Sequence, residues 1–190
     1  MADTLNGKRV AIVATDGVEQ VELTEPRNAL ESAGAQVELV SIEAGEFQGF
    51  NHLDKADTFT ADKAAKDANP DDYHALMLPG GVANPDALRM HRDVVTFIRS
   101  FFEAGKPVAA ICHAPWTLVE ADVVKGRTLT SWPSLQTDIR NAGGTWVDEE
   151  VVVDQGLVTS RKPDDLPAFN AKMLEEFGEG VHEGQARSAA

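Results

Sequence analysis

Short apolar segments alternate with amphipathic segments along most of the chain. Four segments have continuous apolar centres, which is typical of strands buried on both faces of a parallel sheet. They are residues 8–15, 35–42, 73–78 and 107–111. Strands that alternate with helices predict right-handed βαβ crossovers. We therefore expect an α/β fold with a mostly parallel sheet and helices on both faces.

Helical periodicity is clearest over residues 91–104, where apolar residues from Val94 to Phe101 recur at i, i+3, i+4 and i+7. Pro26 suits a first helical turn, so we expect the first helix to begin near Glu25 and to end before Gly34. The other predicted elements are, in chain order, short strands or loop with a brief polar helix over 43–72, helices over 114–121, 134–142 and 163–177, a strand over 127–132, and a hairpin of 146–154 with 157–161.

The chain has 190 residues, which suits one domain with a core over residues 8–177. Residues 178–190 show no periodicity, so we expect a mobile tail there. No apolar run approaches the roughly 18 residues that a membrane span needs. The net charge of −14 argues against nucleic acid and anionic membranes as partners, because their phosphates would be repelled.

The single cysteine, Cys112, cannot form an internal disulfide, which fits a reducing compartment. Residues 1–9 lack the apolar core of a signal peptide, so we expect a cytoplasmic protein. His52, His74 and His91 share no metal-ligand spacing, and the sequence has no nucleotide-binding glycine loop. We therefore expect neither a metal nor a cofactor.

Cys112 follows the fourth predicted strand, with small residues two positions before and after it. This arrangement is typical of a nucleophile elbow, a sharp turn that forces an unusual backbone conformation. A thiol at a helix N-terminus is favoured as the thiolate, so we expect its pKa to lie below the ordinary value of about 8.5. The alternative is a small buried apolar residue, as most free cysteines are.

The active crevice of a parallel sheet lies beyond the carboxyl ends of its strands. Glu19 and Glu22 follow the first strand, so either could face Cys112 and share a proton with it, or both could be solvated. His113 could be a general base or acid for the thiol, or cap a helix. The turn Gly80-Gly81 after the third strand could supply N–H groups to an oxyanion, or be a simple turn.

Several motifs, in order, resemble the PfpI family of intracellular cysteine proteins. They are VEQVELTEP, LMLPGG, KPVAAICHAP, TSWPSLQTDIRNAGGTWVDEEVVVD and VTSRKPDDL, and the similarity spans residues 8–177. That family belongs to the superfamily of the human parkinsonism-associated deglycase and shares the class I glutamine amidotransferase fold. The resemblance implies a flavodoxin-like three-layer sandwich and a homodimer or larger homo-oligomer.

The resemblance also implies roles for particular residues. Cys112 matches the family's nucleophile and His113 its neighbouring histidine. Glu19 matches the glutamate that hydrogen-bonds the cysteine, and Gly80 and Gly81 match the oxyanion-hole turn.

Four positions depart from the family's pattern, two of them from that of its protease-type members; one is Ala114, which stands where the family's ICHGP motif has glycine. Asp86 stands where those members place a glutamate that reaches His113 across a subunit interface, and it is shorter by one methylene. Val82 replaces an arginine, and Trp132 replaces a tyrosine and removes a hydroxyl. The nucleophile is intact, but the protease-type triad is in doubt.

Three functions fit these residues. The first is a stress-response, cofactor-free glyoxalase or deglycase, in which Cys112 attacks a reactive dicarbonyl or its adduct with a protein. The second is an intracellular cysteine peptidase that uses Cys112, His113 and Asp86. The third is a redox sensor or holding chaperone, in which Cys112 is oxidised without turnover.

Overall fold

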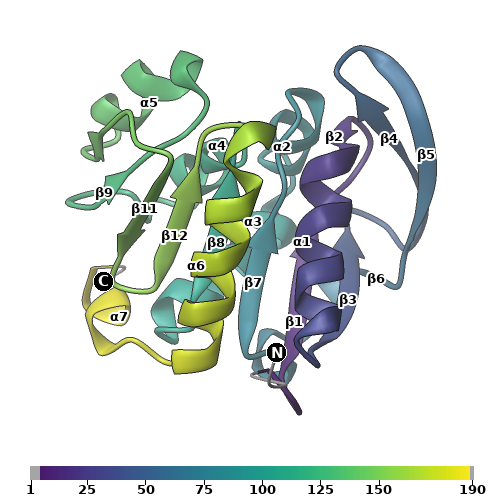
Figure 1. Ribbon diagram of the computed structural model, residues 1–190, viewed down its shortest axis with the longest axis horizontal. Helices are drawn as coiled ribbons and strands as arrows, with labels where there is room; N and C mark the ends of the chain where they lie inside the picture. Colours follow the sequence, from purple (N-terminus) through teal and green to yellow (C-terminus); the bar gives the residue numbers. More distant parts are fainter. Residues whose placement is uncertain (1–4, 189–190) are drawn as a thin grey trace.

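The computed structural model describes residues 5–188, which are arranged around a seven-stranded sheet of order β11-β12-β8-β7-β1-β3-β6 (Figure 1). Its strands are β1 (Arg9–Val13), β3 (Gln36–Ser41), β6 (Lys63–Ala64), β7 (Ala75–Leu78), β8 (Val108–Ile111), β11 (Val151–Asp154) and β12 (Leu157–Ser160). Every neighbouring pair is parallel except β11 with β12. The four predicted buried strands, the hairpin of β11 with β12 and the mostly parallel sheet are confirmed. The strands predicted over 127–132 and 146–154 are shorter than expected, since only Thr128–Leu129, Thr145–Trp146 and Val151–Asp154 are strand, and the first two pair in a separate sheet.

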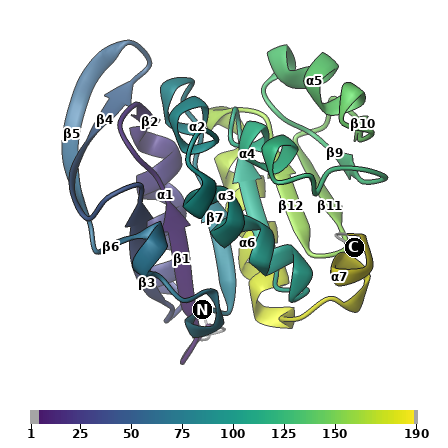
Figure 2. The ribbon, with the colours of Figure 1, turned by 180° about the vertical axis from the view of Figure 1, so that it is seen from behind.

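Helices cover both faces of this sheet. The helices α1 (Gln20–Ser32) and α6 (Leu166–Glu179) lie on one face, and α3 (Arg92–Glu103) and α4 (Pro115–Glu120) lie on the other (Figures 1 and 2). Apart from a small three-stranded sheet, the other elements are α2 (Ala83–Leu88), α5 (Gln136–Asn141), α7 (Glu183–Ser188), four 3₁₀ turns (Ala65–Asp67, Pro70–Asp72, Pro133–Leu135 and Pro163–Asp165) and the short strands β9 (Thr128–Leu129) and β10 (Thr145–Trp146).

Each buried strand contributes side chains to two hydrophobic cores, one on each face of the sheet, because successive side chains point to opposite faces. In β1, Val10 and Ile12 pack toward α1 and α6, whereas Ala11 and Val13 pack toward α3 and α4. Both faces are therefore apolar, which explains the continuous apolar segments in the sequence. The predicted flavodoxin-like three-layer sandwich is confirmed.

The first helix begins at Gln20, so the prediction that it begins near Glu25 is wrong. Pro26 lies inside the helix and is buried. Proline has no N–H, so it leaves the carbonyl of Glu22 without its helical partner. Packing of the helix against the sheet outweighs that loss. As a result, Glu22 belongs to the first turn of the helix rather than to a polar loop.

Residues 43–72 hold more structure than expected. The strands β4 (Gly45–Asn51) and β5 (Asp54–Ala61) form an antiparallel hairpin, and β4 pairs with β2 (Val18–Glu19). Phe47 and Phe59 face each other across it, with ring centroids 5.7 Å apart. Most of its other side chains are polar, so alternation in the sequence is weak. The turn of the hairpin, His52-Leu53, connects β4 to β5.

The C-terminal segment is ordered into a helix. We expected residues 178–190 to form a tail, but α6 continues to Glu179 and α7 packs against the body through Gln185, which is fully buried. The buried Arg127 donates to the Gln185 carbonyl at 3.1 Å. Residues 189–190 lie outside the described residues. Within residues 5–188, no helix has both the length and the apolar character required to cross a membrane.

Candidate active site

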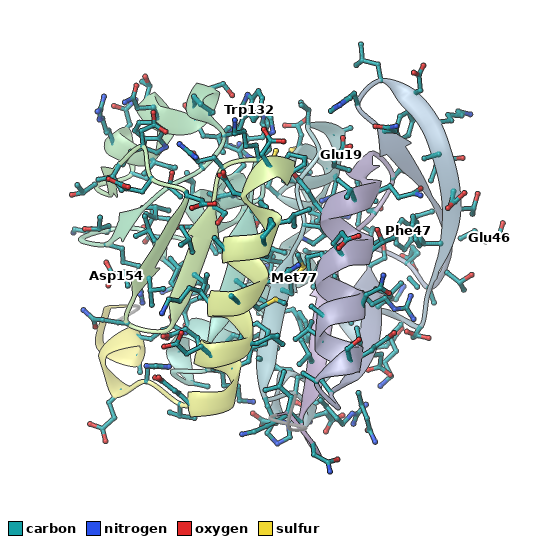
Figure 3. The ribbon with its side chains drawn as sticks, viewed as in Figure 1. Glu19, Glu46, Phe47, Met77, Trp132 and Asp154 are labelled. Carbon is teal, nitrogen blue, oxygen red and sulfur yellow. The ribbon has the colours of Figure 1, made fainter. Side chains whose placement is uncertain are left out.

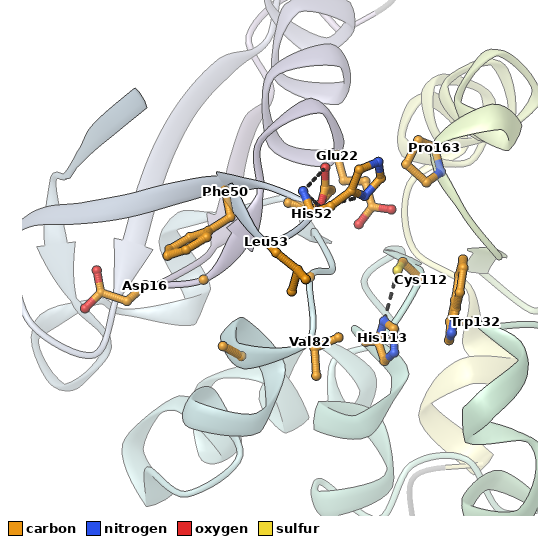
Figure 4. Close-up of a pocket in the computed structure, with 14 residues that line it drawn as sticks. Asp16, Glu22, Phe50, His52, Leu53, Val82, Cys112, His113, Trp132 and Pro163 are labelled. Atoms are coloured by element: carbon orange, nitrogen blue, oxygen red, sulfur yellow. Dashed lines mark hydrogen bonds and ion pairs between the residues drawn. The ribbon is translucent and has the colours of Figure 1, made fainter. Parts of the chain in front are cut away.

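The carboxyl ends of β1, β7 and β8 meet at one edge of the sheet, because these strands are parallel neighbours. The segments that follow them carry Glu19 and Glu22, Gly81, and Cys112, and all four residues line one pocket of about 500 Å³ (Figure 4). Trp132 also lines this pocket, and it lies with Glu19 at the same end of the sheet (Figure 3). The predicted convergence is confirmed.

Cys112 sits on a sharp turn between β8 and α4. Its φ of 64° lies in the left-handed region, which a non-glycine residue rarely adopts. The turn is held on both sides: the Cys112 N–H donates to the Ser160 carbonyl at 3.0 Å, and the Trp132 N–H donates to the Cys112 carbonyl at 2.8 Å. The predicted nucleophile-elbow geometry is confirmed, and it places Cys112, a residue that is 6% exposed, in the lining of the pocket.

His113 reaches the thiol despite being its chain neighbour. The turn brings Nδ1 of His113 to 3.1 Å from Sγ of Cys112. Two indoles lie close to the ring, that of Trp116 at a centroid distance of 5.4 Å and that of Trp132 at 5.6 Å. Burial lowers the pKa of His113 to about 4, because the charged imidazolium is desolvated. At neutral pH the ring is therefore uncharged and can accept the thiol proton.

The carboxyl partner of Cys112 is Glu22. The Glu22 carboxyl hydrogen-bonds the thiol, whereas the Glu19 carboxylate accepts from the His52 N–H at 3.0 Å. The assignment of that hydrogen bond to Glu19 is therefore wrong in this structure. Because α1 begins at Gln20, the Glu22 side chain points from the first helical turn toward the elbow.

Burial raises the pKa of Glu22 to about 8, and the nearby charge of Glu19 adds to the shift. Hydrogen bonds from Cys112 and from the N–H groups of Gly80 and Gly81 oppose it only in part. Glu22 is therefore mostly protonated at neutral pH. Its Oε1 atom is buried without a regular hydrogen-bond partner among the described residues, so a proton there is available to the sulfur or to a substrate.

The thiol of Cys112 is not activated in the resting state. Burial raises its pKa, and the negative charge of ionised Glu22 raises it further. N–H groups of Gly81 and His113 favour the anion but do not offset the burial. The expectation of a lowered pKa is therefore wrong here, since desolvation exceeds the effect of the helix N-terminus. The thiol must lose its proton during reaction, and His113 is in place to accept it.

The Gly80-Gly81 turn has one of its two N–H groups already engaged. The Gly80 N–H donates to Oε2 of Glu22 at 3.0 Å, so it is not free for an oxyanion. The Gly81 N–H faces the sulfur, as does that of His113. A Cβ on Gly80 would lie 2.6 Å from the Cβ of Cys112, so only glycine fits.

Asn84 holds this turn and was missed in the sequence. It is fully buried in α2, donates through Nδ2 to the carbonyls of Pro79 and Gly80, and accepts from the Thr15 N–H at 2.8 Å. It thus joins the ends of β1 and β7. A short polar side chain just after a Gly-Gly turn was the available signal, because asparagine commonly bonds nearby backbone groups.

Asp86 is exposed on α2, and desolvation is the cause of the His113 pKa shift, with no contribution from a carboxylate. Residues 5–188 alone therefore do not bring Asp86 to His113.

Among these residues, one group could hold a metal ion: Glu176, Glu179 and His182, whose ligand atoms lie within 4.8 Å of one another. That group lies at the end of α6, away from the cysteine pocket.

Comparisons with known proteins agree with this geometry. The model of the DJ-1/PfpI family matches residues 8–176. The chain is 43% identical over 172 residues to protein/nucleic acid deglycase 2 of Escherichia coli K12, which covers 90% of this chain and 98% of that protein. It is 42% identical over 167 residues to YraA of Bacillus subtilis 168, named as a candidate cysteine protease, covering 88% of this chain and 96% of that protein.

A solved structure shows the same fold. It is a two-domain protein from Anabaena variabilis with DJ-1/ThiJ/PfpI-like and ferritin-like domains, at a TM-score of 0.85 and 34% identity. The match covers 90% of this chain and 48% of that one, so the chain spans about half of its length.

Proposed function

This chain belongs to the DJ-1/PfpI family, and on that basis we propose that it is a cofactor-free, cysteine-dependent glyoxalase or deglycase. Its substrates are reactive dicarbonyls or their adducts with proteins. The observation that supports this most is the placement of a neutral His113 nitrogen 3.1 Å from the Cys112 sulfur, opposite a protonated, buried Glu22. A base and an acid thus flank one nucleophile.

In the first step, His113 Nδ1 takes the thiol proton while the Cys112 sulfur attacks the aldehyde carbon. A carbon–sulfur bond forms, the carbonyl π pair moves onto oxygen, and Glu22 gives that oxygen its proton. The product is a hemithioacetal. N–H groups of Gly81 and His113, which face the sulfur, stabilise the developing negative charge.

In the second step, ionised Glu22 removes the proton from the carbon that bears sulfur. The electron pair forms a double bond to the neighbouring carbonyl carbon, whose oxygen takes the proton held by His113, and an enediol results. Glu22 then gives its proton to that neighbouring carbon while His113 takes the proton from the oxygen beside sulfur, which leaves a thioester. Water hydrolyses the thioester to a 2-hydroxy acid: its hydroxyl joins the acyl carbon, its proton goes to Glu22, and the sulfur leaves and takes back its proton from His113. With a carbinolamine adduct of a protein, the sulfur displaces the amine nitrogen, which leaves with the proton of Glu22, and the same hemithioacetal forms. No outside oxidant or reductant is needed.

Peptidase activity is the second candidate, because a Cys–His pair is present and a relative is named as a candidate cysteine protease. In the described chain, however, His113 has no carboxylate to orient it. We infer that the protein forms a homodimer or larger homo-oligomer, in which the exposed Asp86 of one subunit approaches His113 of another. The single free cysteine suits a reducing compartment, so we place the protein in the cytoplasm.

The test compares the wild type with Cys112→Ser on methylglyoxal and on an unfolded protein substrate. We expect the wild type to form lactate and to cleave peptide bonds weakly or not at all, and Cys112→Ser to do neither. Lactate formation that persists in Cys112→Ser would overturn the proposal. Strong proteolysis that depends on Cys112, without lactate, would replace it with the peptidase.

A further inference from the structure

A cluster of metal-ligating side chains lies at the end of α6, outside the cysteine pocket. Glu176, Glu179 and His182 stand at i, i+3 and i+6 in the sequence, and their ligand atoms lie within 4.8 Å of one another. None of the three lines the cysteine pocket. The end of α6 and α7 lie at the opposite end of the sheet from Glu19 and Trp132 (Figures 1 and 3). The proposed function therefore gives this cluster no task.

The course of the chain brings the three side chains together. Glu176 and Glu179 share one face of α6, because residues three apart in a helix are neighbours. The helix ends at Gly180, whose φ of 89° is readily adopted only by glycine. The chain turns there, so Nε2 of His182 comes to 3.3 Å from Oε2 of Glu176. The His182 N–H donates to the Gly105 carbonyl at 2.7 Å, which fixes the backbone at this point.

The imidazole of His182 is held in place by its surroundings. A Cβ on Gly156, in the turn between β11 and β12, would lie 2.7 Å from Cδ2 of His182, so glycine at this position makes room for the ring. The His182 side chain is 20% exposed, and its Nε2 atom is buried. The His182 carbonyl accepts from the Gln185 N–H at 3.0 Å. The ring is therefore oriented before any ligand arrives, as a metal ligand should be.

Two buried polar groups in the cluster lack hydrogen bonds. Nε2 of His182 has no hydrogen-bond partner among the described residues, so its 3.3 Å contact with Oε2 of Glu176 does not have hydrogen-bond geometry. The Glu176 side chain is nine-tenths buried, and this contact is its one polar side-chain contact within the described part of the chain. Buried polar groups are normally satisfied, by protein, water or an ion. An ion placed between the two atoms would satisfy both.

The two carboxylates are not neutralised by basic side chains. Lys172, in the preceding turn of α6, pairs with Glu175 at 2.6 Å instead. Neither Glu176 nor Glu179 forms an ion pair with lysine or arginine among the side chains that the structure describes. Buried charges are usually paired or coordinate a metal. A divalent cation would balance the two carboxylates, and a neutral imidazole would add a nitrogen ligand.

The donor set and its spacing suit zinc. Zn²⁺ accepts imidazole nitrogen together with carboxylate oxygen, whereas Mg²⁺ and Ca²⁺ take oxygen ligands. Two ligands at about 2.0–2.1 Å from a tetrahedral zinc ion stand about 3.3 Å apart. Nε2 of His182 and Oε2 of Glu176 have this separation. Glu179 is exposed, so its side chain is free to rotate toward the same point.

We propose that Glu176, Glu179 and His182 form a zinc-binding site, with water as the fourth ligand. The ligands come from α6 and from the segment that leads into α7, so the bound ion joins the two and stabilises α7 on the body of the protein. Since binding favours the state in which the site is formed, zinc should oppose local opening of this segment. The site does not depend on Cys112 or on the proposed function.

Zinc binding is tested on the full-length protein after treatment with EDTA and dialysis, by isothermal titration calorimetry with zinc chloride. We expect one ion per chain in the wild type and in Cys112→Ser, which lacks the thiol as a competing ligand. Affinity should fall at least about tenfold in Glu179→Gln and in His182→Ala, since even the groups that support a ligand are worth that much. Glu175→Gln and His91→Ala remove the same kinds of side chain from exposed positions outside the cluster, so affinity should change less than twofold.

Three results would overturn the proposal: no saturable binding by the wild type, loss of binding in Cys112→Ser, or equal affinities in His182→Ala and His91→Ala. A second measurement uses only the wild type, in case His182→Ala folds poorly. The ring protons of the five histidines are followed by NMR as zinc chloride is added. We expect those of His182 to shift, and the Gln185 amide to exchange with solvent about tenfold more slowly when zinc is at about ten times its Kd. Shifts confined to the other histidines would overturn the proposal as well.

Discussion

The indole of Trp132 stacks on the imidazole of His113, with ring centroids 5.6 Å apart and ring planes 22° apart. The ring of Trp116 also lies close to this imidazole, with ring centroids 5.4 Å apart and ring planes tilted by 56°. Cation–π attraction from two indoles would favour the charged imidazolium, by about 0.5–1 kcal/mol at an exposed site. The pKa of His113 is nevertheless lowered to about 4, so desolvation outweighs that attraction. Burial therefore keeps His113 a neutral base.

Trp132→Ala should raise the pKa of His113 toward its ordinary value of 6.5, because it exposes one face of the ring. Trp132→Phe keeps a stacked ring and should leave the pKa low. The measurement is NMR titration of the His113 ring protons between pH 4 and pH 8. The pH profile of dicarbonyl turnover should shift together with the pKa of His113, and only in Trp132→Ala. Identical titrations in all three proteins would show that Trp132 does not shield His113.

Buried β-strands were predictable from the sequence, because both faces of a central parallel strand are apolar. The amphipathic helix over Arg92–Glu103 was equally clear. The β4–β5 hairpin was not, since its strands are largely exposed and carry polar residues on both faces. Glu183–Ser188 was missed for a related reason: α7 is held by polar contacts such as that from Arg127 to Gln185, which leave no apolar periodicity.

Cys112 and its elbow geometry were predictable from small neighbours at a strand end. The choice between Glu19 and Glu22 was not, because it depends on the residue at which α1 begins. Pro26 pointed to a later start than the Gln20 observed, and moving that start turns these side chains relative to the sheet. The direction of the Cys112 pKa shift could not be predicted from the sequence either, since the burial of this thiol depends on side chains from several distant segments.

Glu22→Gln should change how stability depends on pH. The folded protein keeps a proton on Glu22 up to a pKa of about 8, whereas the unfolded chain releases it near 4.5. The folded state thus binds more protons between these values, so the free energy of unfolding falls as pH rises through this window, by on the order of 3 kcal/mol. Glutamine removes the titration and should flatten the curve. Denaturant melts at pH 5 and pH 8 measure this, with Glu25→Gln as control; an equal pH slope in both variants would contradict it.

Gly80→Ala should destabilise the fold and abolish turnover. A Cβ there would lie 2.6 Å from the Cβ of Cys112 and 2.9 Å from the Ile111 carbonyl oxygen, and would also press on the Glu22 carboxyl. Overpacking of this kind costs about 1–3 kcal/mol. Gly178→Ala is the matched control, because its Cβ meets no atom within 4 Å in a helix and should stabilise by about 0.5–1 kcal/mol. Thermal melts should therefore move in opposite directions.

The proposed homo-oligomer, and the approach of Asp86 to His113 of another subunit, can be tested directly. Light scattering should give a mass of at least two chains. Asp86→Ala should leave the fold intact, since Asp86 is exposed, while altering the titration of His113 in the assembled protein. Asp122→Ala is a comparable loss of an exposed carboxylate. A stable monomer at working concentration, or equal His113 titrations in the two variants, would exclude an intersubunit role for Asp86.

The reactivity of Cys112 toward iodoacetamide should keep rising with pH beyond 9, because burial and the negative charge of ionised Glu22 both raise the thiol pKa. Glu22→Gln removes that charge but keeps the size of the side chain and an oxygen for the Gly80 N–H. Its thiol should therefore titrate about one pH unit lower. Glu25→Gln removes one carboxylate charge from the exposed side of α1, so its thiol should titrate as in the wild type. Rates are measured by mass spectrometry of the single alkylated cysteine, from pH 5 to pH 10. A wild-type rate that levels off below pH 7, and is unchanged by Glu22→Gln, would mean that the backbone N–H groups of Gly81 and His113 outweigh burial and that the thiolate is present before the substrate arrives.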